Sequence, residues 1–168
     1  MIALDRWNAL PPADAIRELL ACCGSQRWAR RVVDRRPFAS LDALRAAADK
    51  IWWQLDEDDW LEAFGHHPRI GERAGTPASA RSADWSGEEQ SRVATAAPDV
   101  QERLRKGNAA YEERFGHIYI VCAANRSAED LLAVLEQRLG NDPRTELRTA
   151  AEEQRKITHL RMERLFGS

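Results

Sequence analysis

Apolar side chains recur along most of the chain at intervals of three and four residues, which places them on one face of an α-helix. The stretch after Ser40 shows this spacing clearly, with apolar residues at Leu41, Leu44, Ala48, Ile51, Trp52 and Leu55. The same spacing predicts helices over residues 13–23, 25–36, 40–55, 56–64, 86–97, 100–115, 127–139 and 143–166. We therefore expect an all-α fold, a single-domain multi-helix bundle that spans residues 1–168.

Residues that commonly begin helices stand at several of these boundaries. Ser127, with Asp130 three positions later, forms a capping-box pattern in which each side chain bonds the backbone N–H of the other residue. Asp142 followed by Pro143 combines a favoured N-cap residue with the residue best suited to the first helical position. These signals strengthen the prediction of the last two helices.

Two segments depart from the helical pattern. Residues 65–84 lack periodicity and are rich in glycine and proline, and irregular stretches of this length are often functional. The run His117–Ala124 is short, apolar and β-branched like a strand, but no other segment reads as its partner. One short extended segment is therefore predicted near 117–124, and its backbone N–H and C=O groups must bond to something other than a strand.

Length, composition and charge narrow the classes of function. The chain has 168 residues, 43% hydrophobic and 31% charged, as in an ordinary globular domain. Its 25 basic and 27 acidic residues give a net charge of −2, which argues against a surface devoted to nucleic acid because such a surface needs a basic excess. No apolar run approaches the roughly 20 residues of a membrane-spanning helix, and Asp5 and Arg6 stand where a signal peptide would be apolar. We expect a cytoplasmic protein that binds neither nucleic acid nor membrane.

Cysteine and histidine positions give no sign of a disulfide framework or a metal site. Cys22 and Cys23 are adjacent and Cys122 is the third, so the count is odd and no CxxC pair occurs. The four histidines have neither ligand-like spacing nor an HExxH motif. The prediction is free thiols, no metal and no other cofactor.

Arg161 is the first candidate for chemistry. At 100° per residue it lies in the middle of the inward stripe of the last helix, one turn after Ile157 and one turn before Leu165. A guanidinium on an inward face stays charged and needs an anion nearby. Two interpretations are open here, a structural ion pair with a buried carboxylate and a clamp for an anionic ligand.

His67 is the second candidate. It precedes Pro68, which disfavours helical geometry at position 67 and holds this residue extended at the start of the long loop. Imidazole is the side chain best matched to proton transfer near neutral pH. The alternative is a loop histidine that is only exposed to solvent.

Two short segments are candidates for ligand binding. Ser86 and Glu89 fit a capping box, which explains both residues structurally, yet the N–H groups of a helix N-terminus also bind carboxylates and polar ligands. Residues 119–123 are either a core strand or an extended backbone whose N–H and C=O groups bond a flat heterocycle rich in amides.

Six motifs follow one another along nearly the whole chain, namely WNALPPADA, RPFASLDALRAAA, HPRIGE, SGEEQ, NAAYEERFGHIYIVCA and NDPRTELRTAAEEQRKITHLRMERL. In this order and with this spacing they resemble the 2-oxo-4-hydroxy-4-carboxy-5-ureidoimidazoline (OHCU) decarboxylase family. Each motif alone is weak evidence for the family, whereas six motifs in this order over one domain are specific evidence.

The resemblance implies an all-helical, usually homodimeric enzyme that needs no metal or organic cofactor and catalyses the last step from urate to (S)-allantoin. It places the family's functional residues at His67 and Pro68, at Ser86, Gly87, Glu88, Glu89 and Gln90, at Tyr119, Ile120, Val121, Cys122 and Ala123, and at Arg161. Tyr119 stands where the family often has Phe, and Ala124 and Asn125 stand where it often has Arg or Gly, so the rim of the pocket differs. The peroxisomal tail of eukaryotic members is absent from this sequence, which favours a cytoplasmic enzyme of the bacterial type.

The implied chemistry gives each residue a role. Loss of CO2 leaves an electron pair that flows into the ring, and the urea-bearing carbon is then protonated on one face. His67 is the candidate acid or base, Glu89 orients His67 or the N–H groups of the substrate, and Arg161 balances the developing negative charge. Gln90 and the backbone of residues 119–123 bind the ureido and ring amides.

Two alternatives belong to other classes of function. The first is a non-catalytic helical interaction module, because six tryptophans could serve an interface. Trp28, Trp52 and Trp60 stand among apolar neighbours in predicted helices, however, which favours a core role for them. The second alternative is a related amide-handling enzyme on the same scaffold.

Overall fold

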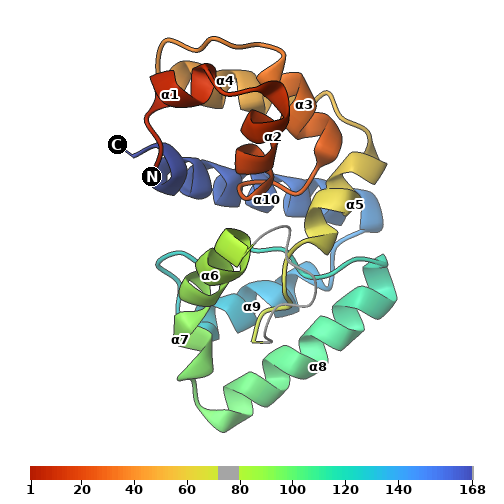
Figure 1. The fold of residues 1–168 in the computed structure, drawn as a ribbon. Coiled ribbons are helices and arrows are strands. Elements are labelled where there is room, and N and C mark those ends of the chain that lie inside the picture. The colour runs from red at the N-terminus through yellow and green to blue at the C-terminus, as the bar shows by residue number, and fades with distance from the viewer. Residues whose placement is uncertain (72–79, 168) are drawn as a thin grey trace. The chain divides into compact units, whose positions relative to one another are not determined.

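The computed structural model describes residues 1–71 and 80–167, and this part of the chain forms ten helices and no strand (Figure 1). The helices are α1 Leu4–Asn8, α2 Pro12–Leu20, α3 Gln26–Val33, α4 Leu41–Trp52, α5 Glu57–Gly65, α6 Ala80–Glu89, α7 Ser91–Ala94, α8 Pro98–Phe115, α9 Ala128–Arg138 and α10 Pro143–Phe166. The prediction of an all-α fold is confirmed.

Most predicted helix starts coincide with the observed ones because the capping residues act locally. Ser40 Oγ accepts a backbone N–H of the first turn of α4 at 3.1 Å. Ser127 and Asp130 form both bonds of the capping box at the start of α9. Asp142 Oδ1 accepts the N–H of Thr145 at 3.0 Å at the start of α10. Each cap provides an acceptor for N–H groups that have no partner within the helix.

The helix around Ser86 differs from the prediction. Ser86 is not an N-cap residue, because it lies inside α6, where it is buried. The next helix, α7, follows Gln90 as its N-cap residue. The S-x-x-E pattern also occurs within helices, and residues 80–85 carry no apolar periodicity that would reveal the earlier start. The predicted helix start at Ser86 and the extension of the loop to residue 84 are therefore wrong, and residues 72–79 of that loop lie outside the described part of the chain.

Contacts within the chain divide it into two compact units. Unit 1 comprises Met1–Ala63 and Arg155–Ser168, and unit 2 comprises Phe64–Gln154. Helix α10 contributes its first half to unit 2 and its second half to unit 1. The single domain over residues 1–168 stays a prediction, and each unit is described by itself.

Tryptophan side chains form much of the core of unit 1. Trp28 is almost fully buried, and its indole N–H donates to the carbonyl of Ala48 at 3.2 Å. Trp60 donates in the same way to the carbonyl of Trp52 at 3.0 Å. These bonds satisfy the polar edge of each indole inside an apolar core. The predicted core role of Trp28, Trp52 and Trp60 is confirmed.

Outside the helices, an arginine closes the turn between α1 and α2 in unit 1. Arg36 Nη1 donates to the carbonyls of Trp7 at 2.9 Å, Asn8 at 3.1 Å and Leu10 at 2.9 Å. Its guanidinium also lies 5.3 Å from the ring centroid of Trp7. Asn8 and Phe38 add a reciprocal pair of bonds between a side-chain amide and a backbone. This part of the chain is held by polar contacts at its surface.

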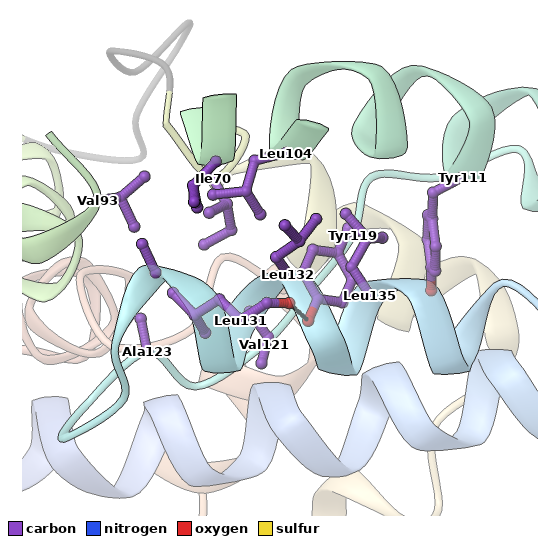
Figure 2. Close-up of a cluster of buried hydrophobic side chains, with 12 residues drawn as sticks. Ile70, Val93, Leu104, Tyr111, Tyr119, Val121, Ala123, Leu131, Leu132 and Leu135 are labelled. Carbon is purple, nitrogen blue, oxygen red and sulfur yellow. Dashed lines mark hydrogen bonds between the residues drawn. The ribbon is translucent and has the colours of Figure 1, made fainter. Parts of the chain in front are cut away.

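Unit 2 is organised around α8 and α9 and the extended segment that connects them. Figure 2 shows side chains from both helices and from this segment pointing toward one another. The unit 2 core consists of Ile70, Val93, Val100, Leu104, Tyr111, Tyr119, Val121, Ala123, Ala128, Leu131, Leu132 and Leu135. The two helices approach closely at Gly107, where an added Cβ would lie 2.6 Å from a methyl carbon of Leu135.

Candidate active site

His66 and His67 follow the end of α5. The N–H of His67 donates to the carbonyl of Phe64 at 3.1 Å, so the chain turns as it leaves the helix. Both imidazoles are half-buried, and Nδ1 of His66 is buried without a hydrogen-bond partner among the described residues. Partial burial of His67 argues against the interpretation of this residue as a loop histidine that is only exposed to solvent.

The loop after His67 is attached to both α7 and α8. Gln90 Oε1, at the start of α7, accepts the N–H of Gly71 at 2.9 Å. Asn108 Nδ2, from α8, donates to the carbonyl of Ile70 at 2.9 Å. Gly71 has a φ of +87°, a left-handed conformation that a side chain would strain. These contacts bring the segment that contains Gln90 to the loop that begins at His67.

The members of the segment 86–90 differ in burial. Ser86 is buried, Glu89 and Gln90 are half-buried, and Gly87 and Glu88 are exposed. Three of the five residues of this segment are therefore at least partly buried.

The electrostatics of Cys122 link this segment to the extended one. Burial raises the pKa of the Cys122 thiol, and the negative charges of Glu153 and Glu89 raise it further. The thiol therefore stays protonated at neutral pH. His67, the segment 86–90 and the segment 119–123 all belong to unit 2.

The extended segment gains its hydrogen bonds from charged side chains instead of a strand. Arg138 Nη1, at the end of α9, donates to the carbonyl of Ile120 at 2.8 Å. Glu153 Oε2, on α10, accepts the N–H of Cys122 at 2.8 Å. The prediction that this backbone bonds to something other than a partner strand is confirmed within the described residues.

Arg138 is held by a buried polar cluster. Its Nε and Nη2 donate to Oε1 of Glu146 at 2.8 and 2.5 Å, and Asn141 donates to the other carboxylate oxygen at 2.9 Å. Tyr111 donates its hydroxyl to Glu146. The guanidinium also lies 4.9 Å from the ring centroid of Tyr119. Both Arg138 and Glu146 are buried.

Ionisation in this cluster is shifted toward charged arginine and neutral tyrosine. Burial opposes the charge of Arg138, but the bonds to Glu146 together with the electrostatic effect of Glu146, Tyr111 and Tyr119 outweigh it and raise the pKa of Arg138 above its usual value. Burial raises the pKa of Tyr111, and its bond to Glu146 raises it further. The guanidinium is therefore a fixed cation whose direction is set by a buried carboxylate.

Arg161 lies in the part of α10 that belongs to unit 1. It is 2% exposed, as its position on the inward stripe predicts, and its Nη1 donates to the carbonyl of Ala21 at 3.4 Å. Burial raises the pKa of nearby Cys23 to about 12, and the positive charge of Arg161 opposes that shift. Arg161 is thus a buried cation beside a backbone carbonyl and a neutral thiol.

A cavity of about 300 Å³ in unit 2 is lined by Ile70, Gly71, Val93, Ala94, Pro98, Gln101, Glu102 and Arg105. None of the predicted site residues lines it. In residues 1–71 and 80–167 no group of three or more His, Cys, Asp or Glu side chains is placed to hold a metal ion. No helix in the same ranges has the length and apolar character needed to cross a membrane.

A sequence model of one protein family, OHCU decarboxylase, matches residues 8–163. The chain belongs to this family. The prediction of the family from its motifs is confirmed.

Individual members give the same result. The chain is 38% identical to the uric acid degradation bifunctional protein TTL of Arabidopsis thaliana over 155 residues, which is 89% of this chain and 47% of that protein. The chain thus spans about half the length of that relative. It is 29% identical to the 2-oxo-4-hydroxy-4-carboxy-5-ureidoimidazoline decarboxylase of Haloferax volcanii, covering 83% of this chain and 81% of the relative.

A solved structure of OHCU decarboxylase in the presence of (S)-allantoin has the same fold. It superposes with a TM-score of 0.78 at 35% identity, and the match covers 90% of this chain and 99% of the solved chain. Family and fold therefore agree over nearly the whole length of that enzyme.

The charged side chains that hold the extended segment are not among the residues predicted for the site. A signal was present, because Arg138 falls seven residues after Leu131 on the apolar stripe of α9. Glu146 and Glu153 likewise share one face of α10 with Ala150. The reasoning that singled out Arg161, a charge within an apolar stripe, applies equally to these three residues.

Proposed function

We propose that the chain catalyses the cofactor-free, stereospecific decarboxylation of 2-oxo-4-hydroxy-4-carboxy-5-ureidoimidazoline to (S)-allantoin. The observation that carries this proposal is the match, over 99% of its length, to an OHCU decarboxylase solved in the presence of (S)-allantoin. A likeness that covers a whole enzyme supports a shared activity as well as a shared scaffold.

The reaction has two proton-dependent steps. The bond from the hydroxyl-bearing ring carbon to the carboxylate breaks, CO2 leaves, and the electron pair forms a double bond to the urea-bearing carbon as the imine nitrogen takes a proton. The hydroxyl then loses its proton and becomes a carbonyl, while the urea-bearing carbon gains a proton on one face. One proton is taken up overall, so the enzyme must supply a group that handles protons at a defined position.

His67 is the group we assign to proton transfer. The half-buried position of its imidazole supports this role, since a side chain screened from bulk water can deliver a proton to one face only. Glu89 orients His67 or the N–H groups of the substrate. The bond between Gln90 and Gly71 supports a shared site for the two segments.

Arg161 is the group we assign to the developing negative charge. It is permanently cationic and buried, and a cation in a water-poor environment stabilises an anion far more than an exposed one does. The clamp for an anionic ligand is therefore the interpretation we adopt. For the assembly and the compartment, we propose a homodimer in the cytoplasm, as the resemblance implies.

Polarimetry on freshly generated substrate tests the proposal. The substrate also decays spontaneously to racemic allantoin, so the enzyme must produce optical rotation as well as faster decay. We expect (S)-allantoin to form in the presence of a chelator and without any added cofactor. Racemic product at the spontaneous rate would refute the proposed function.

A further inference from the structure

The extended segment has two edges, and charged side chains occupy only one of them. In an extended chain, residues two apart direct their N–H and C=O groups to the same edge, and residues between them face the opposite edge. Side chains alternate in the same way: Tyr119, Val121 and Ala123 pack in the unit 2 core, whereas Cys122 and Ile120 do not belong to that cluster, although Ile120 is also buried. The bonded groups, the carbonyl of Ile120 and the N–H of Cys122, therefore share an edge.

The opposite edge is centred on Val121. Among the described residues, its N–H and C=O have no hydrogen-bond partner, although Val121 is only 4% exposed. Further along this edge, the carbonyl of Ala123 accepts the N–H of Arg126 at 3.2 Å. Buried main-chain groups are almost always bonded, to protein, water or ligand. A buried peptide group whose N–H donor and C=O acceptor both lack a partner can form a pair of hydrogen bonds with an amide of a ligand.

The bonded edge is fixed from two helices. Arg138, at the end of α9, is locked by Glu146, so its guanidinium has one direction in which to donate to Ile120. Glu153 is 6% exposed on α10 and accepts from Cys122. A buried ion pair is a costly way to hold one carbonyl, since both charges lose their hydration. This cost is consistent with a requirement that the backbone of the segment be held in an accurate position.

We propose that Arg138 and Glu153 are positioning residues, which clamp one edge of the segment 119–123 so that the N–H and C=O of Val121 bond an amide of the substrate. The inference rests on the proposed function, because it takes the ring and ureido amides of that substrate as the ligand. Recognition runs through the backbone, and the two charged side chains act on the substrate only through that backbone.

Amide hydrogen exchange resolved by residue tests which edge meets the ligand. The wild-type protein is compared with and without saturating (S)-allantoin. Exchange at the Val121 N–H should slow by about tenfold or more, the scale of one hydrogen bond gained. Exchange at the Cys122 N–H should change little, since Glu153 already bonds it. Protection gained at Cys122 and not at Val121 would overturn the assignment.

Variants of Glu153 test the clamp. Glu153→Gln retains an oxygen that accepts the N–H of Cys122, whereas Glu153→Met fills similar space without an acceptor. We expect Glu153→Met to raise KM by about tenfold, with a smaller change in kcat, and Glu153→Gln to stay within about threefold of wild type. Arg138→Lys keeps the charge but lacks the forked donors, and should also raise KM.

A matched control separates positioning from stability. Leu135→Val removes one methylene from the unit 2 core but leaves the side chains of Arg138 and Glu153 in place, and should lower the melting temperature while leaving KM unchanged. Unchanged KM in Glu153→Met, or an equal rise in Leu135→Val, would overturn this inference while wild-type turnover persists. Wild-type protein that forms no (S)-allantoin would instead refute the proposed function.

Discussion

Arg36 and Arg138 both donate hydrogen bonds to irregular backbone, and they do so in different surroundings. Arg36 in unit 1 donates to three carbonyls around the turn between α1 and α2, and it is only half-buried. Arg138 in unit 2 donates to a single carbonyl, that of Ile120, and it is buried against the carboxylate of Glu146. The first closes a turn completely, whereas the second fixes one edge of a segment and leaves the other edge open.

The difference separates a contact made for stability from one made for geometry. Bonds from one cation to three carbonyls satisfy the local backbone and need no further partner. A buried ion pair that holds one carbonyl adds little stability for its cost in desolvation. Loss of Arg36 should therefore lower the free energy of unfolding, whereas loss of the polar groups in unit 2 should lower turnover.

The largest effect should follow from His67→Asn. Asparagine retains hydrogen bonding but cannot transfer a proton at neutral pH, so we expect the rate of (S)-allantoin formation to fall by roughly 10²-fold or more, the usual scale of acid–base catalysis. Binding of (S)-allantoin, measured by calorimetry, should partly survive.

His66→Asn is the matched control for this change. His66 is adjacent and also half-buried, and its replacement should cost far less in rate. Equal losses for His66 and His67, or full stereospecific activity without His67, would mean that the proton-transfer group lies elsewhere.

Arg161→Ala is the most direct test of this difference between the units. Arg161 belongs to unit 1, but we assign it a role in turnover. We expect kcat to fall by roughly 10²-fold, as for other groups that stabilise charge in a transition state, with a smaller relative loss of stability. Urea unfolding and polarimetry on the same preparation measure both quantities. A mainly unfolded variant whose folded fraction keeps full turnover would favour the structural ion pair instead.

Arg36→Met should show the opposite balance. It removes the three hydrogen bonds to carbonyls around the turn, a fourth from Nε to the carbonyl of Val33, and the contact with Trp7. The free energy of unfolding should fall by roughly 1–3 kcal/mol, while kcat and KM stay at wild-type values. Set beside Arg161→Ala, it shows whether loss of a cation from unit 1 harms turnover in general. If kcat of Arg36→Met fell as much as kcat of Arg161→Ala, the two arginines could not be assigned different roles.

The smallest effect concerns pH. Burial holds the pKa of His117 below its usual 6.5, although its contact with the carbonyl of Ile118 opposes this shift. As pH falls, His117 gains its proton in the unfolded chain before it does so in the folded protein. The free energy of unfolding therefore decreases as pH falls from 6.5 toward the lower pKa of the folded state. His117→Phe suits the neighbouring rings of Phe64 and Tyr111 and should flatten this part of the melting-temperature profile. Identical pH profiles for wild type and variant would contradict the shift.

Much of the fold could be predicted because its signals are local. The side chains of Ser40, Ser127 and Asp142 bond N–H groups only three residues away, and such signals are readable without tertiary structure. Ser86 shows the limit of this reasoning. Its spacing to Glu89 looks like a cap, but the preceding residues are already helical, and no periodic pattern reveals it.

The site could be predicted only in part, because its supports come from distant positions. Tyr111 and Glu146 are 35 residues apart, and Cys122 and Glu153 are 31 apart. In a sequence, charged residues on helices usually indicate a solvated face. Only packing shows that Arg138 and Glu146 are buried together, and only then does their contact with Ile120 become visible.

The alternation within the segment 119–123 bears on how this protein can be re-engineered. Tyr119, Ile120, Val121 and Ala123 are all buried, so a saturation library at these codons should yield mostly folding defects. Selectivity carried by peptide groups is insensitive to which side chain is attached, and drift at position 122 should be tolerated. A designer who wants a different heterocycle would do better to alter the register of the segment, by insertion or deletion, than to exchange its residues.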